Sequence, residues 1–198
     1  VAELSREADI GQVRAEVALF ERYLNTLTAV EGGEVADTAL SLADEHFTSG
    51  RMDFSLPRVQ SRELQRLLHR GLIIPAGGQH YRFRHEQLLF YLYAVSAIER
   101  NAEPTEMLLR IKGVAAEEAL VWPLRVFHHR RLQQMAPFLE EALAKPGSLL
   151  FFEKASLLDE MLTWTDIEKY PLAVRVIVES LSADENLERY FYRHLADS

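Results

Sequence analysis

The sequence predicts a mainly α-helical protein with one short β-hairpin, in two parts: residues 1–100 and residues 101–198. Apolar residues recur every three or four positions along most of the chain, which is the spacing of one face of an α-helix. Residues 72–84 instead form two short strand-like runs around a glycine pair, which is typical of a hairpin. With 198 residues, 48% of them hydrophobic, the chain can bury a core of its own.

The first part begins with two amphipathic helices, expected over residues 11–30 and 35–47 and separated by Gly32-Gly33. A break over residues 49–57 follows. Ser61 is then a suitable N-cap for a short third helix whose leucines face inward, and Gly71 is placed to end that helix. The apolar positions on which these helices rest are Val13, Val17, Phe20, Leu24 and Leu27, then Val35, Ala39, Leu42, Ala43 and Phe47, and finally Leu64, Leu67 and Leu68.

The hairpin places Tyr81 and Phe83 on one face and Arg82 and Arg84 on the other. His85 then opens an apolar helix that extends to about residue 100. Two helices, a short third helix, a two-stranded wing and a following helix are the elements of a winged helix. We therefore predict a linker helix and a winged-helix domain within residues 1–100.

Residues 101–198 are expected to be entirely helical, in segments of roughly 10–20 residues separated by Pro and Gly. Pro104 and Pro171 suit the first turn of a helix, and Pro146-Gly147 suits a turn between two helices. We predict a repeat-like helical sensor domain. The sequence shows no clean repeat period. The WPLRV string at 122–126 and the YPLAV string at 170–174 share an aromatic-Pro-Leu-x-Val pattern, but one such pair of strings does not establish a repeat.

Several classes of function are excluded or disfavoured by what the chain lacks. It contains no cysteine, so it has neither disulfides nor thiolate zinc sites. A phosphate-binding loop of the form GxxxxGK[ST] is absent, and the HExxH-like string at His85 has Leu89 where the second ligand belongs. We expect no catalytic residues, no metal and no bound cofactor. The apolar runs are too short to cross a bilayer, and we expect a cytoplasmic protein that makes no membrane contact.

The net charge is −8, yet residues 51–100 are basic, with eight arginines against four acids. Within them, Arg62, Arg66 and Arg70 recur at helical spacing opposite the leucines of the third helix. In a winged helix this is where a recognition helix contacts DNA. The same pattern is also what the solvated face of any short amphipathic helix shows. From the residues alone, both interpretations stay open.

Two further groups could bind an anion. His85 lies where a strand meets a helix, so its ring and the free N–H groups of the helix start could hold a phosphate. Alternatively it caps the helix or packs against Tyr81 and Phe83. The HHRR string at 128–131 could bind phosphate or metal, but adjacent helical residues point about 100° apart. For that string we expect a solvated face.

Two strings carry a family resemblance. LLHRGLII at 67–74, followed by YRFRHEQLLFYLYA at 81–94, resembles the winged-helix segment of the STAND-class NTPases, most of all their NACHT branch. LFERYL at 19–24 is similar to the helix that leads from the helical subdomain of the ATPase module into that winged helix. The resemblance covers roughly residues 13–98, about half of the chain.

The resemblance implies a regulatory segment without catalysis. An upstream module would bind ADP or ATP, and His85 would contact the ADP phosphate in the closed resting state. Residues 101–198 would bind a protein partner or ligand, with self-association in the active state. The alternative is a winged-helix DNA-binding regulator that contacts DNA through Arg62, Arg66 and Arg70 and has a helical ligand or dimerisation domain.

Overall fold

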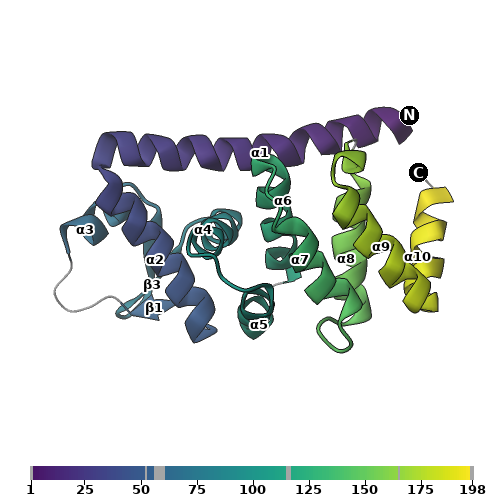
Figure 1. Cartoon of the computed structure of the whole chain (residues 1–198). Helices are drawn as coiled ribbons and strands as arrows, with labels where there is room; N and C mark the ends of the chain where they lie inside the picture. Colours follow the sequence, from purple (N-terminus) through teal and green to yellow (C-terminus); the bar gives the residue numbers. More distant parts are fainter. Residues whose placement is uncertain (1, 52, 56–60, 115–116, 165, 197–198) are drawn as a thin grey trace.

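The computed structural model describes residues 2–51, 53–55, 61–114, 117–164 and 166–196 (Figure 1). In this part of the chain the fold is mainly helical with a small antiparallel sheet, which confirms the coarse prediction. The elements in chain order are α1 (Ala2–Glu31), α2 (Gly33–Ser49), β1 (Phe54–Ser55), α3 (Arg62–His69), β2 (Ile73–Gly77), β3 (His80–Phe83), α4 (Glu86–Glu99), α5 (Pro104–Val114), η1 (Glu117–Leu120), α6 (Val121–Arg130), α7 (Met135–Leu139), η2 (Glu140–Ala144), α8 (Phe151–Leu162), η3 (Ile167–Lys169), α9 (Pro171–Ala183) and α10 (Glu185–Ala196).

The predicted hairpin is present as β2 and β3, which pair antiparallel with Ile73 opposite Phe83. A third strand, β1, pairs with the other edge of β3, so that the strand order is β1-β3-β2. The sequence analysis treated residues 54–55 as part of a break, because two residues are too few to show an alternating pattern. Their strand conformation comes from pairing with Tyr81 and His80.

Local signals set the ends of α3 as expected. The hydroxyl of Ser61 accepts the N–H of Leu64 at 3.3 Å, which is an N-cap hydrogen bond. Gly71 has a φ of +68°, and a Cβ at that position would lie 3.2 Å from Nη1 of Arg84. A side chain there would be strained and would crowd the guanidinium, so glycine is required where the chain leaves α3 for the wing.

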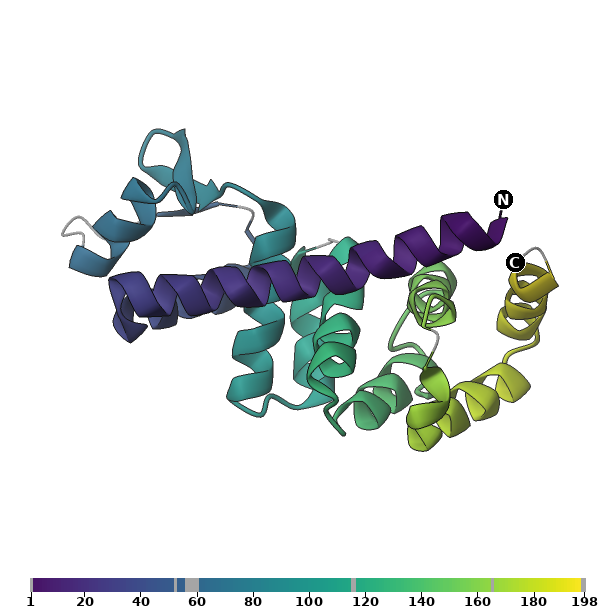
Figure 2. The ribbon, with the colours of Figure 1, turned by 90° about the horizontal axis from the view of Figure 1, so that it is seen from above.

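Helix α1 is longer than predicted, because it begins at Ala2 rather than at Gly11. It lies along one side of the molecule and crosses α2, α4 and α6 (Figures 1 and 2). Its residue Phe20 packs against the rings of Tyr91 on α4 and Trp122 on α6, with centroids 5.7 and 5.5 Å away, and those two rings lie 6.3 Å from each other. One helix of the first part therefore packs directly on the second part.

The helices after α4 form two layers. Helices α5, α7 and α9 contact one another in succession, and so do α6, α8 and α10. Corresponding helices begin 30 to 36 residues apart, at 104, 135 and 171 in one layer and at 121, 151 and 185 in the other. No recurring sequence string was identified at this spacing. The WPLRV and YPLAV strings begin helices of different layers, so their spacing of 48 residues is not the structural period.

Most prolines in this half lie in the first turn of a helix, while Pro146 with Gly147 forms the predicted turn between η2 and α8. Pro104 and Pro171 are the first residues of α5 and α9, as predicted. Pro123 and Pro137 lie at the third position of α6 and α7, where the sequence analysis expected breaks. A first-turn N–H has no intrahelical acceptor, so a proline there removes no helix hydrogen bond.

The buried core is continuous from Val17 to Leu187. The predicted division near residue 100 falls in the short loop between α4 and α5, where Asn101 has a φ of +54°. An ion-pair network crosses this loop: Arg100 and Arg110 each contact both Asp44 on α2 and Glu106 on α5, at 2.7–3.0 Å. The two parts are thus held together by α1, by shared core and by this network.

Candidate functional site

His85 lies at the N-cap of α4, directly after the wing. Its backbone is extended, with φ −122° and ψ 117°, and its carbonyl accepts the N–H of Leu89 at 3.1 Å. The N–H groups of the first helical turn, from Glu86 to Leu88, have no intrahelical acceptors and carry the positive end of the helix dipole. This end of α4 can therefore accept an anion beside the His85 ring.

The side chain of His85 is exposed and makes no capping hydrogen bond. The interpretation as a core histidine is therefore wrong: Phe83 is buried in the core and Tyr81 is half-buried against it, while His85 points elsewhere. The interpretation as a side-chain cap is not supported either. Arg84 and Glu86, its neighbours in the chain, are also exposed, so the ring is open to a ligand.

The three arginines predicted for DNA contact differ in their surroundings: two of them contact Glu31, and the third is exposed. Arg66 Nη1 donates to the carbonyl of Glu31, the last residue of α1, at 2.5 Å. Arg70 Nε donates to the carboxylate of the same Glu31 at 2.6 Å. Arg62 is exposed at the start of α3. Arg66 and Arg70 therefore join α3 to the C-terminal end of α1, where positive charge is favoured by the helix dipole.

Glu31 was not singled out from the sequence as a partner for these arginines. The signal that could have found it is its place directly before Gly32-Gly33, because an acid in the last turn of a helix is unfavourable unless a cation offsets it. Arg66 and Arg70 follow Glu31 by 35 and 39 residues in the sequence, however, so only the tertiary fold reveals these contacts.

The expectation of a solvated face for residues 128–131 was wrong for His128, His129 and Arg130, whereas Arg131 is exposed as expected. His128 is buried, stacks on Trp164 at 4.2 Å between ring centroids, and has its Nε2 2.8 Å from a carboxylate oxygen of Asp166. His129 and Arg130 both contact Glu21 of α1, at 2.7 and 3.2 Å. These residues hold α1 and η3 against α6, and their partners are too distant in sequence to be inferred from the local pattern.

A second group of polar contacts between α6 and its neighbouring helices is centred on Arg125; we call each such group of contacts between helices a polar joint. Arg125 donates from Nε and Nη2 to the same oxygen of Glu160 on α8, at 3.0 and 2.8 Å, and its guanidinium lies 5.1 Å from the ring centroid of Trp122. Nη1 also reaches Glu16 of α1 at 3.5 Å. One guanidinium thus connects α1, α6 and α8.

Among the described residues, no group of three or more His, Asp or Glu side chains is arranged to hold a metal ion. The same residues contain no helix with the length and apolar character needed to cross a membrane. No protein-family model matches the chain, and no curated protein or solved structure is significantly similar to it.

Proposed function

We propose that this chain is a regulatory, non-catalytic segment of a STAND-type signalling NTPase. Its first part is a winged helix that presents His85 to an ADP molecule bound by a separate nucleotide-binding module. Its second part is a repeat-like helical array that binds a protein partner. Nucleotide and partner then favour different arrangements of the two parts, which is a population shift and not catalysis by this segment.

The observation that carries the proposal is that His85, the N-cap residue of α4, has an exposed side chain that makes no capping hydrogen bond. The order of elements from α2 to α4 and the strand order β1-β3-β2 support the winged-helix interpretation. The strings at 67–74 and 81–94, which resemble the STAND family, form the wing and the helices on either side of it. The two-layer arrangement of α5 to α10 agrees with a helical array that binds partners.

The contacts between the two parts identify what a switch would have to change. Arg110 of α5 reaches Asp44 of α2, and Arg100 at the end of α4 reaches Glu106 of α5. Glu21 of α1 holds His129 and Arg130 of α6. Each contact is a discrete, mostly solvent-accessible polar joint, which can exchange for water or another partner. Opening would break these contacts and also separate the core that the two parts share, such as Phe20 of α1 on Trp122 of α6.

The DNA-binding alternative is less favoured, because Arg66 and Arg70 are engaged by Glu31 and the chain carries a net charge of −8. A protein that neutralises several phosphates binds duplex with an affinity that falls steeply as salt rises. Retention of a random-sequence duplex with that salt dependence would favour the alternative over our proposal.

The proposal can be tested by titrating ADP into a polypeptide that joins this chain to the proposed nucleotide-binding module, followed through NMR signals of the His85 ring and of the amides of residues 86–88. Within this chain we expect saturable shifts confined to this end of α4. Loss of a hydrogen bond to a charged phosphate corresponds to about 1.5–3 kcal/mol, so the variant H85L should bind ADP at least about tenfold more weakly.

His69 provides the matched control, because it is an exposed histidine on α3 away from the start of α4. The variant H69L should keep the full ADP response. Shifts that are equal in H85L and the parent, or that centre on another part of the chain, would overturn the role given to His85.

A further inference from the structure

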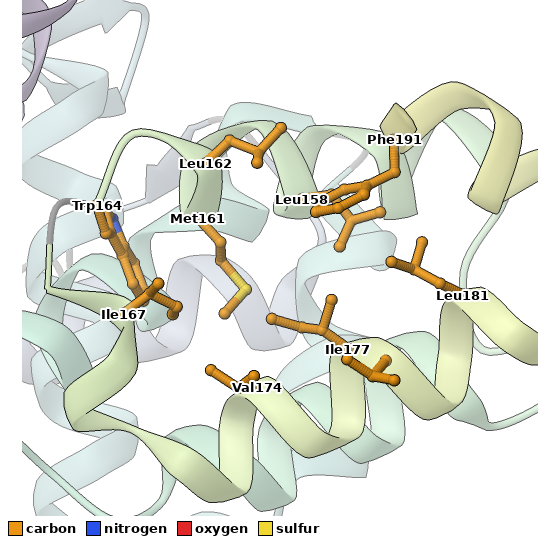
Figure 3. Close-up of a pocket in the computed structure, with 10 residues that line it drawn as sticks. Leu158, Met161, Leu162, Trp164, Ile167, Val174, Ile177, Leu181 and Phe191 are labelled. Atoms are coloured by element: carbon orange, nitrogen blue, oxygen red, sulfur yellow. The ribbon is translucent and has the colours of Figure 1, made fainter. Parts of the chain in front are cut away.

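A cavity of about 210 Å³ opens between α8, α9 and α10 (Figure 3). Val174 and Ile177 of α9 point toward Met161 of α8, while Trp164 closes one end and Phe191 of α10 closes the other. The lining side chains are apolar throughout. We call this cavity and its open side the α8–α9 groove.

The groove lies between α8 and α9, each of which packs mainly on other helices. Helix α8 packs on α10 and α6, whereas α9 packs on α7, η2 and α10. On the α9 side of the groove Leu181 is buried and Val174 is half-buried, but Val178 is 56% exposed. An apolar groove with an exposed wall is a surface suited to a partner.

The size and lining of the groove argue for side chains of a macromolecule rather than a small molecule. Small-molecule sites have volumes of roughly 300–1,000 Å³ and a few polar groups that orient the ligand. This groove is smaller and its walls are hydrocarbon, sulfur and aromatic ring. Two helices side by side with apolar ridges accept a third helix, whose side chains fill the space between them.

The surroundings of the groove are acidic. Asp159 and Glu168 adjoin the lining residues Leu158 and Ile167 in sequence, and Glu188 lies one helical turn before Phe191. For these three acids the described part of the chain supplies no ion-pair partner, although the hydroxyl of Tyr190 donates a hydrogen bond to Asp159 at 2.7 Å. The nearby cations Lys169, Arg175 and Arg189 are by contrast paired, with Asp166, Glu179 and Glu185. Arg193, two residues after Phe191, has no ion-pair partner among the described residues and is a cation that opposes this acidic character. Over residues 151–198 the chain has 10 acids and 5 bases.

We propose that the α8–α9 groove binds an amphipathic helix of a partner protein, one with apolar side chains on one face and Lys or Arg on the flanks. The apolar residues fill the cavity and the basic residues meet Asp159, Glu168 and Glu188. This inference rests on the proposed function in one respect, since it assigns the partner site of the helical array and the chemistry of the partner.

The test uses a fluorescein-labelled, 18-residue designed peptide with leucines on one face and lysines on the other, and measures its binding by fluorescence anisotropy. We expect saturable binding that weakens as salt screens the charges. A second peptide, in which glutamates replace the lysines, should bind at least about tenfold more weakly at low salt, because like charges meet at the rim.

Two variants locate the site. V178N places a polar group on the exposed wall of the groove and should weaken binding of the lysine peptide by about tenfold. V30N is its matched control, because Val30 is also a helical valine, is 61% exposed and lies on α1. E188Q should weaken binding of the lysine peptide but leave a peptide of the same leucine face with neutral glutamines unchanged.

Three results would overturn the proposal: no binding of the lysine peptide, equal binding by V178N and the parent, or a dimer of the chain in sedimentation that V178N dissociates. The last result would assign the groove to a second copy of this chain. The ADP titration of His85 is a separate experiment. Peptide binding without an ADP response would overturn the nucleotide role alone, and the reverse result would overturn the groove alone.

Discussion

The variant R125M is expected to lower the free energy of unfolding by about 3 kcal/mol, because it leaves the buried carboxylate of Glu160 without its cation. Glu160 is only 7% exposed, and Arg125 provides two of its hydrogen bonds, at 3.0 and 2.8 Å. Its other polar contact is a longer one from Trp164 Nε1, at 3.5 Å. A neutral indole N–H at that distance cannot offset the desolvation of a carboxylate.

The effect of R125M should extend beyond one ion pair. The Arg125 guanidinium also lies over the ring of Trp122 and reaches Glu16, so its loss loosens α1 and α8 from α6 together. Methionine retains much of the aliphatic packing, which makes the missing charge the main change. Urea unfolding should show a lower midpoint with an unchanged slope, the signature of lower stability without a change in the unfolding unit.

The control is R175M, because Arg175 pairs with Glu179 on the exposed side of α9. Exposed pairs of this kind contribute about 0–1 kcal/mol, so R175M should unfold within about 0.5 kcal/mol of the parent. The double variant R125M/E160M removes the stranded carboxylate and should recover part of the lost stability. An R125M variant as stable as R175M would show that Glu160 finds another partner or water, and would remove this joint from our account.

The second large effect concerns pH and His46. This histidine is 1% exposed on the inner face of α2, and neither ring nitrogen has a hydrogen-bond partner among the described residues. Burial disfavours the charged ring and lowers the pKa of His46 to about 4, although the carboxylate of Asp53 acts in the opposite direction. The folded protein therefore holds a neutral histidine that becomes protonated when the chain unfolds in mildly acidic solution.

The direction of the pH dependence follows from linkage. Between about pH 6.5 and pH 4 the unfolded chain binds a proton at this histidine and the folded chain does not, so stability falls as pH falls through this window. One pKa unit corresponds to about 1.4 kcal/mol, and the full effect approaches about 3 kcal/mol. Above pH 6.5 both states are neutral at His46 and its contribution to the slope vanishes.

The variant H46L should remove this contribution, because leucine fills the site without unsatisfied nitrogens. At pH 7 it should be as stable as the parent or more stable, by about 1 kcal/mol. The difference in unfolding free energy between H46L and the parent should then widen from pH 6.5 to pH 4. A constant difference across this range would show that His46 is protonated or hydrogen-bonded in the folded protein.

The sequence predicted features that depend on a few neighbouring residues. The cap at Ser61, the left-handed glycine at Gly71 and the hairpin of β2 and β3 are each set by local backbone chemistry, and all three were confirmed. Pro104 and Pro171 likewise marked helix starts, because the fixed φ of proline suits a first turn. Strand β1 was missed, because its conformation depends on pairing with β3.

The polar joints could not be predicted, because each forms between distant segments. His128 to Arg130 looked like a solvated face, yet their partners Asp166 and Glu21 lie 38 and 108–109 residues away. Amphipathic patterning shows that a helix has a polar side, but it does not show whether that side meets water or another helix. The same limit applied to Arg66 and Arg70, whose partner Glu31 closes α1.

For the candidate site, the sequence located His85 correctly at the junction of wing and helix but left its environment open between ligand contact, cap and core. Exposure of the side chain decides against the core, and the absence of a side-chain cap hydrogen bond leaves the ring available. The α8–α9 groove was not foreseen, because a stripe such as Val174, Val178 and Leu181 is the ordinary signature of a buried face.

The central claim, that His85 holds a nucleotide-dependent closed state, is tested most directly by the rate at which ADP leaves a polypeptide that joins this chain to the nucleotide-binding module that we propose for it. The account predicts that H85L releases bound ADP at least about tenfold faster than the parent, as expected for loss of a hydrogen bond to a charged phosphate, while H69L releases it at the parent rate. Equal release by H85L and the parent, or a polypeptide that binds no nucleotide, would contradict it.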